Sequence, residues 1–292
     1  RGTPTPFGLR SDTTGAEFDD QSTGNTNPII SSFDTDGFTL GTSGSGPNDN
    51  ARTYVAWCWK ANGGTTATNN EGNLTSTVQA NTKAGFSIMT FGNYTSASGA
   101  TIGHGLGKAP SLYFHKSRAS SGNWHVYHSS LGATKAMLLN SSNSVATAIG
   151  YWANTEPTST VLSLGNTFAG TGNGVVYAWS EIEGFSSFGT YIGSGNSNGA
   201  FIYTGFRPAM YFVKNATASN GWFVYDKLRD GFNGQNDTLS WQSTSAEDNT
   251  YQQDILSNGF KVRDSNNATN QSGQTFIYGA WADVPFKTNN SR

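Results

Sequence analysis

Short apolar segments alternate along this chain with turns that are rich in Gly, Asn and Ser. Tyr211–Val213 and Phe223–Tyr225 are apolar at every position, which is typical of strands covered on both faces of a sheet. Ser257–Gly259 and Thr35–Gly37 contain the residues that hairpin turns favour. Helical periodicity is nearly absent, and only Ala246–Leu256 could form one or two turns. The pattern predicts an all-β fold.

One stretch of the chain occurs twice. GKAPSLYFHKSR contains Pro110, and the similar GFRPAMYFVKNA contains Pro208 at the same place. The segments that follow contain Trp124 and Trp222, and each tryptophan lies at the same distance along the chain from its proline. A constant offset over two strand-like segments indicates an internal repeat.

The closing part of the repeat also occurs a third time, near Arg1. FDTDGFTLG and RTYVAWCWK resemble DILSNGFKV and QTFIYGAWA at one constant offset, which aligns Gly37 with Gly259 and Trp59 with Trp281. We therefore predict tandem antiparallel β-sandwich repeats, of jelly-roll or concanavalin-like type, with a partial first copy. The predicted boundaries are a partial first repeat at 1–60, a linker at 61–83 to which LTSTVQA could add a strand, sandwich repeats at 84–183 and 184–287, and a polar tail at 288–292.

The partial copy leads to a prediction about assembly. It keeps strands expected around Phe38–Leu40 and Tyr54–Trp59 but lacks counterparts of Phe86–Phe91 and Leu112–Tyr127. Its aromatic strand would then offer apolar surface and open edges to another chain. Either residues upstream of Arg1 supply the missing strands, or a neighbouring subunit covers the surface. In both cases we expect a homo-oligomer, most simply a trimer.

Composition and charge limit the classes of partner and cofactor that we expect for this chain. Of the 292 residues only 12% are charged and 13% are aromatic, which is typical of a folded chain and not of a disordered one. The net charge of −2 predicts no nucleic-acid partner. No apolar run reaches the roughly 20 residues that span a bilayer, so we expect no membrane insertion. Cys58 is the single cysteine, which excludes a disulfide framework and a cysteine-based zinc site. We expect no cofactor.

Four longer blocks carry a family resemblance. They are IGHGLGKAPSLYFHKSRASSGNWHVYHSSLGATKAMLLNSS, YVAWCWKA, EIEGFSSFGTYIGSGNSNGAFIYTGFRPAMYFVKN and DILSNGFKVR. Over Phe33–Lys287 the chain resembles a repeat domain of unknown function in virion structural proteins of marine tailed phages, especially tail fibres. The resemblance implies an appendage protein on the virion surface, extracellular, in contact with other virion proteins. It brings no catalytic residues to this chain.

Two tryptophans are candidate ligand-binding residues. The repeat matches most of the tryptophans to one another, and a position shared by two copies favours a role in the scaffold. Trp152 and Trp241 have no clear counterparts. An unmatched tryptophan in a turn-rich segment is a common stacking platform for a sugar or a protein partner. The alternative for both is a place in the core or at a subunit interface.

Other polar residues are weaker candidates for a metal site or a catalytic site. The four histidines all lie in the middle copy, and no His-x-His places two ligands on one strand face, so we expect no metal. The turn Asp34–Gly37 begins like a calcium loop but lacks the later acidic ligand. Two carboxylate pairs could serve a glycan-cleaving enzyme. The residues in question are His104, His115, His125 and His128, then Glu181 with Glu183 and Asp226 with Asp230.

Three functions follow from these patterns. The first is a tail-fibre-like structural protein that adheres to a host surface, most simply a glycan, without catalysis. The second is a purely structural fibre-shaft, decoration or filament-forming subunit. The third is a glycan depolymerase, although we predict no enzyme. An acid-lined groove would favour the third function, exposed Trp152 or Trp241 beside a polar groove the first, and burial of both at a subunit contact the second.

Overall fold

The computed structural model describes residues 7–19, 29–41, 46–62, 65–95, 100–166, 172–231 and 233–283. It is built from strands, and the described residues contain one short helix, α1 (Asn267–Asn270). The predicted all-β class is therefore confirmed. The turns considered for Ala246–Leu256 are not helical, because the end of this segment is the strand β20 (Gln253–Leu256).

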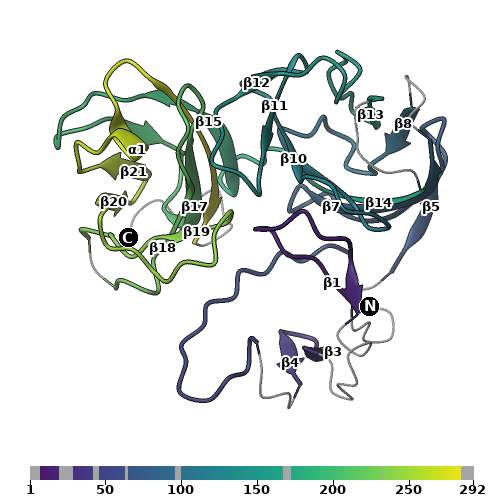
Figure 1. The fold of residues 1–292 in the computed structure, drawn as a ribbon, viewed down its shortest axis with the longest axis horizontal. Helices are drawn as coiled ribbons and strands as arrows, with labels where there is room; N and C mark the ends of the chain where they lie inside the picture. Colours follow the sequence, from purple (N-terminus) through teal and green to yellow (C-terminus); the bar gives the residue numbers. More distant parts are fainter. Residues whose placement is uncertain are drawn as a thin grey trace.

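The first large sheet has eight antiparallel strands in the order β12-β11-β10-β9-β14-β7-β6-β5 (Figure 1). A separate pair, β8 (Ala100–Gly103) with β13 (Val161–Leu164), shares an apolar core with one face of this sheet. The strands of the sheet are β5 (Ala67–Asn69), β6 (Ser76–Asn81), β7 (Phe86–Tyr94), β9 (Leu112–Ser117), β10 (His125–His128), β11 (Lys135–Leu138), β12 (Ala146–Thr147) and β14 (Gly172–Trp179).

The second large sheet has five strands in the order β15-β22-β17-β18-β19. A three-stranded sheet, β16-β21-β20, shares a second apolar core with it. The strand order matches β7-β14-β9-β10-β11 of the first sheet, so the order of the shared strands is the same in both. The new strands are β15 (Ser186–Ile192), β16 (Phe201–Tyr203), β17 (Pro208–Asn215), β18 (Trp222–Asp226), β19 (Leu239–Ser240), β21 (Gly259–Val262) and β22 (Thr275–Ala282).

Both large sheets are apolar on both faces, because a third core lies between them. On β17, Tyr211 and Val213 point into the core of their own sandwich, whereas Phe212 points into the core between the sheets. On β9, Tyr113 and Phe114 divide in the same way. We call the core between the sheets the central core. It explains why these strands are apolar at every position, as the sequence predicts.

Two pairs of aromatic residues that the repeat matches are buried at equivalent places. Trp124 and Trp222 lie in the central core, and so do Phe114 and Phe212. Their neighbours correspond as well, since Tyr127 pairs with Tyr113 across β10 and β9, and the matching residues pair across β18 and β17. The jelly-roll or concanavalin-like type stays a prediction.

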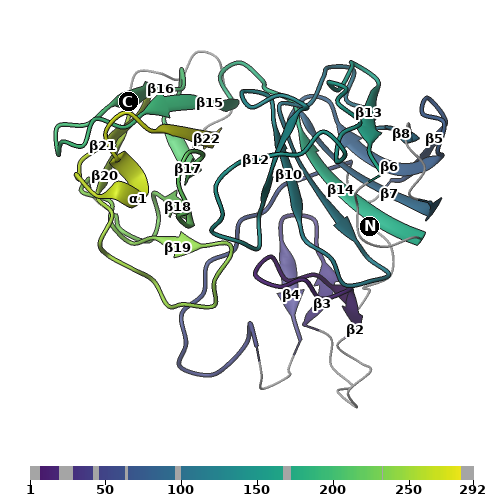
Figure 2. The same ribbon diagram turned by 45° about the horizontal axis from the view of Figure 1, so that its top comes forward.

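The N-terminal part of the chain forms two hairpins on one side of the large sheets (Figures 1 and 2). They are β1 (Phe7–Gly8) with β2 (Phe18–Asp19), and β3 (Ile30–Phe33) with β4 (Phe38–Leu40). The β1–β2 register repeats that of β11–β12, in which Lys135 and Ala146 take the places of Phe7 and Phe18. Phe7 and Lys135 are separated along the chain by the same number of residues as Phe18 and Ala146. The first hairpin is therefore a copy of the β11–β12 pair.

Two expectations about the N-terminal part need correction. The segment Tyr54–Trp59 is extended but forms no strand. Its counterparts β14 and β22 are central strands with a neighbour on each side, and no described strand lies beside residues 54–59. The segment 61–83, expected to be a linker, carries β5 and β6, so the LTSTVQA strand does extend the first sheet.

Candidate functional site

Three tryptophans from equivalent positions meet in the central core. The ring centroids of Trp59 and Trp179 are 5.7 Å apart, those of Trp59 and Trp281 are 5.2 Å apart, and those of Trp179 and Trp281 are 5.8 Å apart. The three interplanar angles are 73°, 72° and 66°, so every pair packs edge to face. Each ring therefore has nearly the same relation to the other two, as around a three-fold axis.

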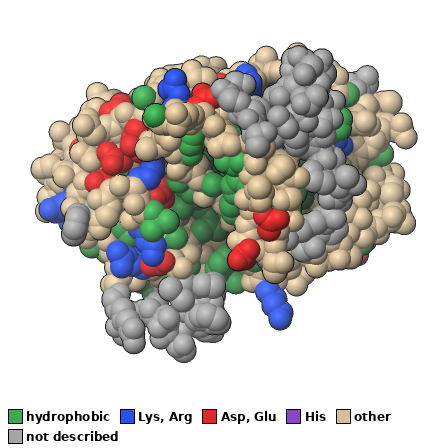
Figure 3. Space-filling view, turned by 90° about the horizontal axis from the view of Figure 1, so that it is seen from below, with side chains coloured by type: hydrophobic (Ala, Val, Ile, Leu, Met, Phe, Trp, Pro, Cys, Tyr) green, Lys and Arg blue, Asp and Glu red, His purple; other side chains and the backbone are tan. Residues whose placement is uncertain are grey.

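The central core is open on one side. Two sides are closed by the large sheets, and the described residues that cover the third side belong to the N-terminal part of the chain. Viewed from that side, apolar side chains gather on the floor of a hollow between the two halves of the molecule (Figure 3). Two cavities lie there, of about 380 Å³ and 290 Å³, and Trp57 lines both.

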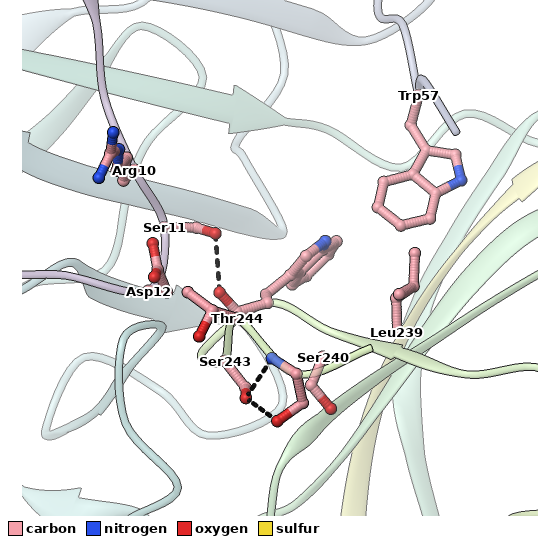
Figure 4. A pocket seen from close by; sticks show the side chains of 10 residues that line it. Arg10, Ser11, Asp12, Trp57, Leu239, Ser240, Ser243 and Thr244 are labelled. Carbon is pink, nitrogen blue, oxygen red and sulfur yellow. Dashed lines mark hydrogen bonds between the residues drawn. The ribbon is translucent and has the colours of Figure 1, made fainter. Parts of the chain in front are cut away.

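The larger cavity lies between the N-terminal hairpin and the end of β19 (Figure 4). Arg10–Asp12 line one side of it, and Trp57 with Leu239 lies across from them. The hydroxyl of Ser11 donates to the carbonyl of Trp241 at 2.7 Å, which ties the two walls together. The cavity thus combines an apolar wall with a rim of hydroxyls and charged groups.

Trp241 lies behind this cavity and packs against both sheets. Its ring centroid is 5.8 Å from that of Phe114 in the first sheet and 5.0 Å from that of Phe212 in the second. It is partly buried, so the structure places this candidate in the central core with one part facing the cavity.

Trp152 is placed differently, in the core of the first sandwich. Its side chain is 0% exposed, its indole N–H donates to the carbonyl of Lys135 at 3.0 Å, and its ring packs edge-on against Tyr113. A buried ring presents no face for stacking on a sugar. In this conformation Trp152 serves the packing of the sandwich.

An ion pair borders the smaller cavity. The carboxylate of Asp226 accepts from Arg229 Nε at 2.6 Å and from the indole N–H of Trp57 at 3.3 Å. Arg229 also donates to the carbonyl of Val224 at 3.1 Å and forms an ion pair with Glu247. Asp226 and Arg229 are both largely buried, so this carboxylate is held by scaffold contacts.

The other candidate carboxylates make local contacts with the main chain. Glu181 and Glu183 were expected to share a strand face, but both follow the end of β14, and Glu181 accepts a hydrogen bond from the amide of Phe188 at 3.1 Å. Asp230 accepts from the amide of Asn236 at 2.6 Å. Asp34 lies in the hairpin turn between β3 and β4, where its amide donates to the carbonyl of Gly37 at 2.8 Å.

The histidines are buried and held as neutral rings. His128 accepts from the amide of Ser130 at Nδ1, 3.2 Å, so its Nε2 donates to the carbonyl of Tyr278 of the second sheet at 3.1 Å. Burial lowers the pKa of His128 to about 4 and that of His125 to about 4. Burial also lowers the pKa of His115 and His104. Among the described residues, no three His, Cys, Asp or Glu side chains are grouped so that they could hold a metal ion.

An exposed aromatic pair on β16 escaped the sequence analysis. Phe201 is 45% exposed and Tyr203 is 64% exposed, and Ile192 at the end of β15 is 56% exposed. The same edge of the first sandwich is covered, since β6 pairs with β7 and the amide of Leu74 donates to the carbonyl of Thr101 at 3.0 Å. The signal was present in the sequence, because FIY in the last copy replaces TIG in the middle copy.

The fold places the chain in the class of all-β proteins with two large antiparallel sheets that pack around a shared core. Within that class the chain belongs to the family described as domain of unknown function DUF7483, whose model matches residues 4–285. Neither a curated protein nor a solved structure matches the chain. Among the described residues, no helix has the length and apolar character needed to cross a membrane.

Proposed function

We propose that this chain is a structural module of a virion appendage of the tail-fibre kind, extracellular and without catalysis. The virion part of the proposal comes from the resemblance of the quoted blocks to tail-fibre repeats. The module part is supported by one observation, the central core in which Trp59, Trp179 and Trp281 meet. A core that joins distant segments through large aromatic side chains makes a rigid unit, as a load-carrying appendage requires.

Microscopy of virus particles tests this proposal. Antibodies against the 292-residue chain, detected with gold particles, should label the appendages of purified tailed-phage particles that encode it. Particles of a phage that lacks the gene are the control. Antigen found in infected-cell lysate but on no particle would overturn the proposal.

Adhesion to a host surface is the second candidate function, and the exposed pair Phe201 and Tyr203 favours it. The two rings lie on the same face of β16, because Ile202 between them is buried. Neighbouring exposed aromatic rings suit stacking on sugar rings. Host-cell glycan is therefore the proposed ligand, at this edge instead of at Trp152.

A binding assay with intact host cells separates adhesion from a purely structural role. The labelled chain should bind cells, soluble host polysaccharide should compete, and F201A/Y203A should lower binding about tenfold or more, as loss of stacking from two rings implies. Ile149→Ala removes an equally exposed apolar side chain elsewhere and is the matched control. Equal binding by both variants would exclude this edge, and release of new reducing ends would contradict the non-catalytic part.

We also propose self-association into a homo-oligomer, most simply a trimer. The strands β15 and β16 end their sheets, and the apolar side chains beside them are exposed. Open edges of this kind support pairing with another chain. Light scattering of the purified chain tests this proposal, and a stable monomer across the concentration range would refute it.

A further inference from the structure

Two contacts in the molecule are copies of each other. The indole N–H of Trp124 donates to the carbonyl of Arg10 at 2.8 Å, and the indole N–H of Trp222 donates to the carbonyl of Leu138 at 2.9 Å. The two donors occupy equivalent positions of the repeat. The two acceptors do so as well, because Arg10 precedes Leu138 by the same number of residues as Phe7 of β1 precedes Lys135 of β11. In each large sheet, therefore, a tryptophan donates a hydrogen bond to an equivalent carbonyl of the preceding repeat.

The buried lysines repeat this arrangement. Lys116 Nζ donates to the carbonyl of Thr14 at 3.2 Å, and Lys214 Nζ donates to the carbonyl of Ser142, also at 3.2 Å. The acceptors are again related by the offset between β1 and β11. A main-chain contact repeats as well, from the amide of Glu17 to the carbonyl of Arg118 at 3.0 Å and from the amide of Val145 to the carbonyl of Ala216 at 2.9 Å.

The last repeat carries the same acceptors. Ser240 takes the place of Leu138 at the end of β19, and the carbonyls of both residues accept the same turn hydrogen bond, from Ser243 and from Ser141, at 3.3 Å each. Among the described residues no indole N–H reaches the carbonyl of Ser240, and no lysine reaches that of Thr244. The 380 Å³ cavity lies at this point, lined by Ser240 and Thr244.

We propose that this cavity is the binding site for a tryptophan side chain from a third β-sheet of the same repeat. The indole N–H donates to the carbonyl of Ser240, and a lysine of the neighbouring strand donates to the carbonyl of Thr244. The incoming strands pair with residues 54–59 on both sides and turn that segment into a central strand. The third sheet thereby closes the open side of the central core around the axis of Trp59, Trp179 and Trp281.

The arrangement identifies the source of the third sheet as the same polypeptide. A second copy of this chain does not supply it, because Trp124, Trp222 and their lysine partners already make these contacts within the molecule. The third repeat is in place in part, since β1–β2 and Trp59 occupy the positions that β11–β12 and Trp179 occupy in the first sandwich. The proposed strands would thus complete a position around the axis that β1–β2 and Trp59 already occupy in part.

Cys58 provides a built-in reporter of the third sheet. Its counterparts are Ala178 and Ala280, which are 0% exposed in the cores of their own sandwiches. Cys58 itself is exposed. Pairing of residues 54–59 with strands on both sides would therefore bury this thiol, and burial slows alkylation.

The first experiment probes the cavity with indole alone, on the chain as it is. Indole should bind, with intermolecular nuclear Overhauser contacts to Leu239 and Trp241, and 1-methylindole should bind about fivefold more weakly because it lacks the donor. Ser243→Trp, which fills the cavity from its wall, should abolish binding, whereas Ser130→Trp, outside the cavity, should not. Equal binding of the two probes, or no contact to these residues in the folded protein, overturns the proposal.

The second experiment supplies the missing strands. Residues 84–134 are repeated directly before Phe7, in place of residues 1–6, because Phe7 of β1 corresponds to Lys135 of β11. Alkylation of Cys58 should slow roughly tenfold or more. Replacing the added copy of Trp124 by Ala should restore the original rate, while replacing the added copy of Ser130 should not.

Two outcomes of the second experiment decide against the proposal. Unchanged alkylation in a folded, extended chain would show that the third sheet does not form there. Alkylation of the original chain that slows as its concentration rises would show that a second copy covers the hollow instead. Neither outcome bears on labelling of virus particles, so the proposed appendage role and this inference fail separately.

Discussion

The rings of Trp59 and Trp281 lie edge to face with centroids 5.2 Å apart, although they come from opposite ends of the chain. Trp59 belongs to a segment without a strand partner, and Trp281 belongs to the central strand of the second sheet. Their contact therefore joins the segment around Trp59 to the central core through its side chain.

Trp59→Ala should loosen the segment around Trp59 and lower the stability of the protein. Loss of a large, partly buried ring that contacts Trp179 and Trp281 should lower the free energy of unfolding by about 2–4 kcal/mol. Urea unfolding followed by circular dichroism measures this change. Tyr54→Ala, which removes an exposed ring from the same segment, should cost less than about 0.5 kcal/mol and is the control. Equal costs would show that the tryptophan contact contributes nothing.

The buried histidines should make the protein lose stability in mild acid. The pKa of His128 and of His125 is lowered from 6.5 to about 4 in the folded state, so between these values the unfolded chain binds more protons. Stability is then full above about pH 6.5 and falls as the pH drops toward 4, by about 1.4 kcal/mol per pH unit for each histidine. Melting temperatures at pH 7.5, 6 and 5 measure the slope.

A single substitution isolates the contribution of His128. Gln at this position can still donate to the carbonyl of Tyr278 but does not titrate. His128→Gln should therefore make the loss of stability with falling pH smaller, by about the contribution of one histidine. His128 is suited to this test because its ring links the two sheets. A slope that is the same in the variant would mean that other groups cause the loss in acid.

The ion pair beside the smaller cavity should behave as a structural pair. Arg229→Met leaves the carboxylate of Asp226 buried without its cation, which should cost about 3 kcal/mol or more. The double variant Asp226→Asn with Arg229→Met removes both charges and should recover most of that loss. Chemical unfolding of the original chain, the two single variants Asp226→Asn and Arg229→Met, and the double variant gives the coupling energy. A double variant that is as unstable as the single one would contradict a role limited to the scaffold.

The repeat could be predicted from the sequence because the matched side chains make equivalent contacts in the fold. Trp124 and Trp222 keep their spacing since each must reach a carbonyl of the preceding repeat. The apolar runs of β9 and β17 likewise reflect sheets with a core on each face. Long-range contacts of this kind leave a local pattern, and that pattern was predictable.

Other features depend on partners that a local pattern does not reveal. Residues 54–59 have strand-like composition but form no strand, because strand formation needs neighbours. Trp152 lacks a counterpart in the last repeat, yet it fills the core of the first sandwich. The candidate cavity brings Arg10–Asp12 together with Leu239–Ser245, and no motif connects two segments so far apart.

The two tryptophan contacts predict equal energetic costs. Trp222→Phe keeps most of the buried ring but removes the indole N–H that donates to the carbonyl of Leu138 at 2.9 Å. That carbonyl retains only the turn hydrogen bond from Ser141 at 3.3 Å, so the free energy of unfolding should fall by about 1–2 kcal/mol.

Trp124→Phe should cost about the same, because Trp124 makes the same bond to the carbonyl of Arg10 at 2.8 Å. The two losses should add within about 0.5 kcal/mol in the double variant, since the contacts lie in separate interfaces. Trp241→Phe is the control, because the hydrogen bonds that Trp241 makes with described residues come from its main chain. Urea unfolding of the original chain and the four variants measures the costs. A loss for Trp124→Phe several times smaller than for Trp222→Phe would mean that the contacts are not equivalent, and the basis for a third site at Ser240 would fall with them.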